Sequence, residues 1–206
     1  MKKVNKKLDV VFLLDRSGSM QNCIEDTIGG YNSYLEKQRK NKNTLITTVL
    51  FDDHYELLHN RVEIDKVNDI TKEEYYTRGC TALLDAIGES ITMMDKSKSE
   101  KALFVITTDG LENASHKYNK NQIKEMIEGH PNWEFIYIGA NIDSYAEASQ
   151  IGIRRNNIAN YEQSSTGVKD LFCAIDEATC EMQKCSSIGS ANWKRKLDNF
   201  IENNQE

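Results

Sequence analysis

Apolar runs of strand length alternate with amphipathic segments along most of this chain. Residues 8–14 and 101–107 are apolar almost throughout, which is typical of strands buried on both faces of a parallel sheet. The predicted strands are residues 8–14, 45–51, 54–64, 101–107, 133–138 and 158–161. The tight turn at Asp52-Asp53 makes the third of these an antiparallel edge strand beside the second.

Between these runs, apolar residues recur at the spacing of helices that bury one face. The clearest sets are Ile24, Ile28, Tyr31 and Leu35, and then Leu84, Ile87, Ile91 and Met94. Shorter patterns predict helices around residues 123–127 and 145–151, and a longer one begins after a cap at Ser164 or Ser165. Strands that alternate with helices predict an α/β fold with helices on both faces of a mostly parallel sheet.

The composition favours one domain with a sizeable core. The chain has 206 residues, of which 39% are hydrophobic and 28% charged, and it contains a single proline. We predict a domain over residues 1–186 and a C-terminal polar or amphipathic tail over residues 187–206. The tail carries an apolar stripe of Trp193, Leu197, Phe200 and Ile201. This stripe fits packing on the domain, and docking of a partner is the alternative.

Charge and cysteine usage exclude several classes of protein. A formal net charge of -6 argues against nucleic-acid binding, which needs a basic face. The five cysteines form no CxxC pair, so neither a zinc site nor a disulfide framework is expected. A buried inert thiol is expected at Cys80, and a redox-sensitive thiol that alters metal binding is the alternative. No apolar stretch is long enough to cross a bilayer, so we expect a cytoplasmic protein without membrane contact.

Oxygen-bearing side chains gather at the predicted carboxyl ends of central strands. Asp15, Ser17 and Ser19 follow the first strand on alternate residues of a turn, and Asp109 follows the fourth. Thr81 opens the helix that leads into the fourth strand, so its hydroxyl starts at the same edge. In open α/β sheets, ligands bind beyond these strand ends, where the strand order reverses. Oxygen ligands with few carboxylates suit a hard cation such as Mg²⁺.

Each of these segments also has a simpler interpretation. Aspartate and serine in the first loop can cap a helix, Thr81 can do the same, and Asp109 fits a turn before Gly110. The arrival of three separate segments at one sheet edge favours metal binding. Asp85 lies one turn into the Thr81 helix, and we expect it to bond backbone groups near the site instead of the ion.

Three motifs carry these side chains. They are Asp15-x-Ser17-x-Ser19, then Gly79-x-Thr81-x-Leu83-x-Asp85-Ala86-Ile87, and then Thr108-Asp109-Gly110. Their order and context resemble the metal-ion-dependent adhesion site (MIDAS) of von Willebrand factor A domains, with all five ligand positions matched. The resemblance covers roughly residues 8–184 and implies a three-layer, doubly wound, Rossmann-like fold. In that fold a mostly parallel six-stranded sheet has one antiparallel edge strand and helices on both faces.

The resemblance also implies a function. Ser17, Ser19 and Thr81 would supply hydroxyl ligands to Mg²⁺, with Mn²⁺ or Ca²⁺ as alternatives, while Asp15 and Asp109 would act mainly through bound waters. One position would stay open for an Asp or Glu carboxylate of a partner protein, and the surrounding loops would set specificity. The expected protein is a Mg²⁺-dependent interaction module and not an enzyme. The segment 138–153 is similar to small standalone bacterial and phage members, which suggests a stress-response or phage-related system.

Two other functions compete with this expectation. A metal-dependent phosphohydrolase of the haloacid dehalogenase type also begins with an aspartate after the first strand. Those enzymes need a second aspartate two residues on, where this chain has Ser17, and the chain has neither a P-loop nor a GxSxG motif. An adhesin fragment from a larger secreted protein is the other alternative, which the free cysteines oppose.

Overall fold

A six-stranded sheet with the order β3-β2-β1-β4-β5-β6 forms the centre of the molecule. The computed structural model describes residues 7–185 and 187–198 of the chain. The strands are β1 Leu8–Asp15, β2 Thr44–Phe51, β3 Tyr55–Glu63, β4 Ala102–Thr108, β5 Trp133–Gly139 and β6 Ile158–Asn160. Every strand predicted from the sequence is present, with its ends moved by at most one residue.

The sheet has one antiparallel edge and one reversal of strand order. All neighbouring strands run parallel except β2 and β3, whose antiparallel pairing shifts register twice between Ile46 and Val49. This confirms the predicted edge strand. The chain runs outward from β1 to β3 on one side and from β4 to β6 on the other, so the order reverses between β1 and β4. Ligand sites of open α/β sheets lie at this reversal.

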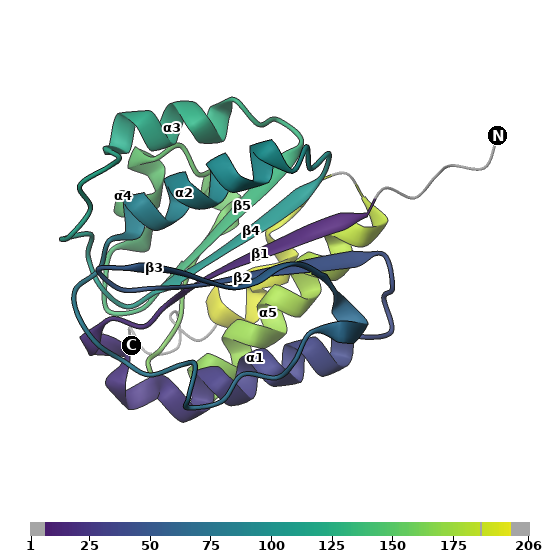
Figure 1. Cartoon of the computed structure of the whole chain (residues 1–206), viewed down its shortest axis with the longest axis horizontal. Helices are drawn as coiled ribbons and strands as arrows, with labels where there is room; N and C mark the ends of the chain where they lie inside the picture. Colours follow the sequence, from purple (N-terminus) through teal and green to yellow (C-terminus); the bar gives the residue numbers. More distant parts are fainter. Residues whose placement is uncertain (1–6, 186, 199–206) are drawn as a thin grey trace.

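Helices cover both faces of the sheet, which completes the expected three layers (Figure 1). α1 Ile24–Gln38 and α5 Ser165–Lys184 lie on one face, and α2 Leu83–Lys96, α3 Lys120–Glu128 and α4 Ser144–Gln150 lie on the other. None of the helices within residues 7–185 and 187–198 is long and apolar enough to cross a membrane.

The strand β1 explains the apolar pattern of the first predicted strand. Val10, Phe12 and Leu14 join the hydrophobic cluster under α1 and α5, whereas Val11 and Leu13 join the cluster under α2, α3 and α4. Since successive side chains of a strand point to opposite faces, both sets must be apolar. The continuous apolar run is therefore a direct consequence of two covered faces.

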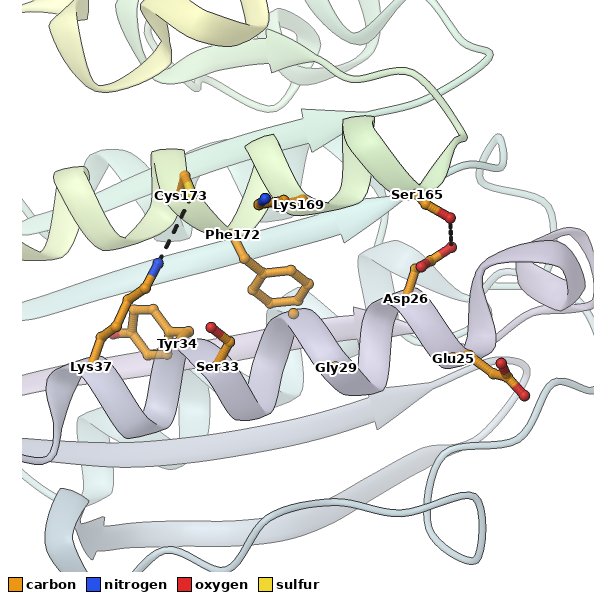
Figure 2. Close-up of a pocket in the computed structure, with 11 residues that line it drawn as sticks. Glu25, Asp26, Gly29, Ser33, Tyr34, Lys37, Ser165, Lys169, Phe172 and Cys173 are labelled. Carbon is orange, nitrogen blue, oxygen red and sulfur yellow. Dashed lines mark hydrogen bonds between the residues drawn. The ribbon is translucent and has the colours of Figure 1, made fainter.

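The helices α1 and α5 lie side by side, and a groove of about 340 Å³ runs between them (Figure 2). Phe172 of α5 lies against Gly30 of α1, where an added Cβ would come within 2.2 Å of the ring. At one end of the groove the Ser165 hydroxyl donates to Asp26 Oδ2 at 2.8 Å. The close approach of the two helices thus depends on the missing side chain at Gly30.

The helix starts agree with the sequence in one case and correct it in another. Ser164 caps α5, because its hydroxyl oxygen accepts the Gly167 N–H at 3.1 Å. Thr81, which was predicted to open α2, lies two residues before the first helical residue. Ala82 stands at the N-cap without a side-chain cap. The expected opening at Thr81 is wrong because its hydroxyl faces the sheet edge and not the first helical turn.

Residues 65–79, for which the sequence predicts neither a strand nor a helix, contribute to the core. The segment starts near the short helix η2, Ile64–Lys66. Val67, Ile70 and Tyr75 are buried against the cluster of α1 and α5. Three isolated apolar residues have no helical or strand period, so the sequence pattern does not reveal their burial.

The residues after α5 also pack on the sheet-and-helix body. Ile188, Trp193 and Leu197 are buried in the same cluster as α1 and α5, and Trp193 lies in the short helix η4, Ala191–Lys194. For these residues the apolar stripe packs on the domain, whereas Phe200 and Ile201 lie outside the described residues. A boundary at residue 186 stays a prediction.

All five cysteines are free. Cys23 is buried and Cys173 and Cys180 are half-buried, but Cys80 is exposed. The expectation of a buried thiol at Cys80 is wrong, because the loop that leads to Thr81 runs over the surface and turns inward only at Thr81.

Candidate metal centre

Asp15, the last residue of β1, is a fully buried carboxylate at the carboxyl edge of the sheet. Its Oδ1 accepts the Ser17 N–H at 2.7 Å, and its Oδ2 accepts the Thr108 hydroxyl at 2.5 Å. Thr108 ends the neighbouring strand β4. The Tyr75 hydroxyl donates to the backbone oxygen of Asp15 at 2.5 Å. The orientation of this carboxylate is therefore set by the loop, by β4 and by the segment before α2.

Ser17, Ser19 and Asp109 form a chain of hydrogen bonds. Ser17 Oγ and Ser19 Oγ lie 3.1 Å apart, and Ser19 Oγ donates to Asp109 Oδ1 at 2.5 Å. The short helix η1, Gly18–Cys23, turns the chain here, with Ser17 in an extended conformation at its start. Ser17 and Asp109 are buried and Ser19 is exposed, so the middle member of this chain of bonds lies at the surface.

Thr81 reaches the same point from the loop before α2. The position of a Cβ added to Gly110 marks that point, because it would lie 3.0 Å from Thr81 Oγ1. It would also lie 3.6 Å from Ser19 Oγ and 3.9 Å from Ser17 Oγ. Asn113 Oδ1 accepts the Thr81 N–H at 2.9 Å and holds the residue in place. Three hydroxyl oxygens from two separate loops thus face the space beside Gly110.

Backbone hydrogen bonds join the two loops that carry these hydroxyls. The Gly18 N–H donates to the Gly79 carbonyl at 3.3 Å, and the Arg78 N–H donates to the Arg16 carbonyl at 2.9 Å. Gly79 has φ +64°, a conformation that favours glycine, and a Cβ there would lie 2.2 Å from Asp53 Oδ1. The glycine lets the loop before α2 turn close to the β2–β3 turn and align with the first loop.

The two carboxylates carry negative charge that the protein does not neutralise. Burial, together with the charge of Asp109, raises the pKa of Asp15 to about 6, against hydrogen bonds from Thr108 and Ser17 that lower it. Burial also raises the pKa of Asp109, against hydrogen bonds from Ser19 and Gln163. No basic side chain of the described residues contributes to either shift. Three hydroxyls beside two such carboxylates form a donor set that fits a hard divalent cation.

Gln163 belongs to this site, although no sequence motif marks it. From the loop between β6 and α5, its Nε2 donates to Asp109 Oδ2 at 2.7 Å and to the Ser19 carbonyl at 3.1 Å. Asn141, at φ 57° in the loop after β5, donates through Nδ2 to Gln163 Oε1 at 2.7 Å. In the sequence, Gln163 is only a polar residue before the Ser164 cap.

Ion pairs around the buried Arg16 support the first loop. Arg16 is fully buried, and its Nε donates to Asp52 Oδ2 at 2.9 Å while a second nitrogen donates to Glu56 at 2.7 Å. Arg78 Nε donates to the same Asp52 oxygen at 2.7 Å. Burial raises the pKa of Asp52, but Arg78 and Arg16, together with the hydrogen bond from the His54 N–H, hold it below its usual value. The residue between Asp15 and Ser17 thus anchors the loop to β2.

Asp52, Asp53 and His54 form a second cluster of potential ligand atoms, in the turn between β2 and β3. The two arginines already neutralise the Asp52 carboxylate. This cluster is separate from the three-hydroxyl site, and its Asp52 carboxylate pairs with the two arginines.

Asp85 behaves as expected from the sequence. Its Oδ2 accepts the His116 N–H at 2.9 Å, and its Oδ1 accepts the N–H groups of Lys117 and Tyr118 at 2.9 and 3.0 Å. The carboxylate therefore ties the loop that follows Asp109 to the first turn of α2 and does not face the hydroxyls.

Solved structures with a similar fold include a protein of the mussel byssus, a pilus tip protein and a protein from Plasmodium vivax. Proximal thread matrix protein 1 from the mussel byssus, with a zinc-occupied MIDAS motif, is 17% identical with a TM-score of 0.64, covering 85% of this chain and 46% of that chain. The vWF domain of the type V pili tip protein Mfa5 from Porphyromonas gingivalis is 10% identical, with a TM-score of 0.68. The match covers 90% of this chain and 99% of that domain. Manganese-loaded TRAP protein from Plasmodium vivax is 18% identical, with a TM-score of 0.60. The match covers 81% of this chain and 72% of that chain.

These likenesses show that the chain has the fold of von Willebrand factor A domains. The chain spans less than half the length of the mussel protein and nearly all of the Mfa5 domain. Neither the protein-family models nor the curated protein sequences give a match to it.

Proposed function

We propose that this protein is a Mg²⁺-dependent interaction module that binds an Asp or Glu carboxylate of a partner protein. The observation that carries the proposal is the meeting of Ser17, Ser19 and Thr81 hydroxyls at one point beside Gly110. The buried carboxylates Asp15 and Asp109 flank this point without a basic partner among the described residues. Such a set attracts a divalent cation.

The chemistry of the donors favours Mg²⁺, with Mn²⁺ and Ca²⁺ as alternatives. The hydroxyls of Ser17 and Ser19 would hold the ion directly, that of Thr81 directly or through water depending on the state, and the carboxylates would act mainly through water. A bound Mg²⁺ with few direct carboxylates keeps electrophilic character and can accept a further oxygen ligand. Since Ser19 is exposed, a partner can approach an ion bound there from the solvent side.

Two exposed apolar side chains lie in the loops that carry Asp109 and Thr81, and we propose that they supply a surface for the partner. Leu111, two residues after Asp109, is 54% exposed, and Tyr76, in the loop before Thr81, is 42% exposed. Exposed apolar groups beside a charged centre are typical of interaction surfaces. The partner therefore contributes a carboxylate with an apolar residue beside it.

We propose that the protein is not an enzyme. Among the described residues, the hydrogen bonds of Ser17 and Ser19 side chains run to each other and to Asp109, and no histidine activates either hydroxyl as a nucleophile. A metal-dependent phosphohydrolase is the rival function, and turnover of a phosphate ester that is lost in Asp15→Asn would favour it. We also propose a cytoplasmic setting, which the five free cysteines support. The resemblance of residues 138–153 is what supports the proposal of a bacterial stress-response or phage-related system.

The test compares metal binding and partner binding in wild type and Asp109→Ala. Isothermal titration with MgCl₂ and MnCl₂ should show one site in the wild type and at least a tenfold loss of affinity in the variant. Capture of partners from a native lysate should depend on Mg²⁺ and fail with EDTA. Asp65→Ala, at an exposed aspartate of η2, is the control and should behave as wild type. Partner binding that survives both EDTA and Asp109→Ala would contradict the proposal.

A further inference from the structure

Every oxygen of the two carboxylates at the metal centre already accepts a hydrogen bond from the protein. Asp15 Oδ1 and Oδ2 accept from Ser17 and Thr108, and Asp109 Oδ1 and Oδ2 accept from Ser19 and Gln163. A carboxylate held at both oxygens cannot turn freely to grip a cation with both of them. The way each carboxylate is held therefore limits how many oxygen ligands the centre can offer.

Gln163 differs from the other three donors. The donors to Asp15 are a backbone N–H and the hydroxyl of Thr108, which is buried at the end of β4, and Ser19 is itself a proposed ligand. Gln163 is half-buried and comes from the loop before α5. Its Nε2 lies 2.7 Å from Asp109 Oδ2 and 3.1 Å from the Ser19 carbonyl oxygen. It can be removed without breaking a strand or a helix.

The Gln163 amide is also oriented from its far side. Asn141 Nδ2 donates to Gln163 Oε1 at 2.7 Å, so the amide oxygen faces Asn141 and the amide nitrogen faces Asp109. Asn141 adopts a left-handed conformation with φ 57°, which asparagine tolerates better than most residues. The two amides thus form a chain of hydrogen bonds from the loop after β5 to Asp109 Oδ2.

We propose that Gln163 makes the centre select Mg²⁺ and Mn²⁺ over Ca²⁺, an inference that rests on the proposed function. Ca²⁺ takes six to eight oxygen ligands and often binds carboxylates through both oxygens. Mg²⁺ takes six in a tight octahedron and retains water. Because Gln163 holds Asp109 Oδ2, the carboxylate cannot bind Ca²⁺ through both oxygens. Only Oδ1 is left, for a contact through water. Gln163 is a positioning residue in this scheme, because it acts on the ion through Asp109.

The experiment measures the dissociation constants of MgCl₂, MnCl₂ and CaCl₂ with the full chain by isothermal titration. In the wild type, Mg²⁺ and Mn²⁺ should bind more tightly than Ca²⁺. In Gln163→Ala, the ratio of the Ca²⁺ to the Mg²⁺ dissociation constant should fall about tenfold, chiefly because Ca²⁺ binds more tightly. Asn141→Ala should change this ratio in the same direction by a smaller factor.

Two further variants serve as a second test and as a control. Gln163→Asn is one methylene shorter and should reproduce the change even if Gln163→Ala unfolds. Gln150→Ala, on α4, removes a glutamine that accepts from Lys120 and should leave the ratio unchanged. Thermal unfolding in EDTA checks that each variant is folded.

The outcomes separate this inference from the proposed function. A wild type that binds no divalent cation overturns both. A wild type that binds Mg²⁺, with an unchanged ratio in the folded Gln163 variants, overturns the role of Gln163 alone.

Discussion

Gly110 is the residue on which the geometry of the centre depends most directly. It follows Asp109, and three hydroxyl oxygens lie within 3.9 Å of the position that its Cβ would take. Thr81 is the nearest of the three, and its backbone is held by Asn113. A side chain at Gly110 would therefore compete with a cation for the same hydroxyls.

Gly110→Ala should lower Mn²⁺ and Mg²⁺ affinity by about tenfold or more with little loss of stability in EDTA. The added methyl group meets Thr81 Oγ1 at 3.0 Å, so the hydroxyl must give way by a few tenths of an ångström. Isothermal titration and thermal unfolding measure the two effects. Gly29→Ala, where an added Cβ meets nothing within 4 Å, is the matched control. Equal metal affinity in both variants would show that the hydroxyls do not surround the ion.

At the scale of elements, strand ends bring the ligands together and helices hold the sheet that places them. The ends of β1 and β4 contribute Asp15 and Thr108, which bond each other directly. The order and ends of these strands follow from apolar runs in the sequence. The packing of α1 against α5 does not, because it depends on a contact between Gly30 and Phe172, which are far apart in the chain.

Gly30→Ala and Gly29→Ala should shift stability in opposite directions. At Gly30 the new Cβ lies 2.2 Å from the Phe172 ring, and such overpacking of a buried contact costs about 1–3 kcal/mol. At Gly29 the space is open, and alanine in a helix interior gains about 0.5–1 kcal/mol over glycine. Denaturant unfolding of the two variants gives the comparison. A gain of stability in Gly30→Ala would mean that Phe172 can move aside freely.

At the scale of the whole molecule, the loops that carry the proposed metal centre also carry two exposed apolar side chains. Leu111 and Tyr76 come from the loops that carry Asp109 and Thr81, whereas the exposed Leu57 lies on the edge strand β3. The proposed partner surface is thus formed by loops that neighbour each other only because β1 and β4 are adjacent.

Leu111→Ser should weaken partner binding about tenfold and leave Mg²⁺ affinity unchanged. The side chain is 54% exposed and takes no part in the ligand set, so it contributes contact area alone. Binding is measured with the partner captured in the Mg²⁺-dependent pull-down. Leu57→Ser, at a leucine 39% exposed, is the control away from the site. If both leucines matter equally, the partner does not dock at the metal centre.

The sequence by itself determined the α/β class, the six strands and the edge at which oxygen ligands gather. Apolar periodicity reports which faces of an element are buried, and this is a local property. Since parallel strands present their carboxyl ends at one edge, the positions of Asp15, Thr81 and Asp109 in the chain are enough to predict that they meet there.

Only the tertiary structure decided how that edge is built. It placed Thr81 outside α2, exposed Cys80, paired the buried Arg16 with Asp52 and brought Gln163 onto Asp109. These contacts join residues in loops without a period, and Gln163 and Asp109 are 54 positions apart. Their geometry follows from how the packed strands and helices fix the loop ends, which no local pattern of apolar and polar residues records.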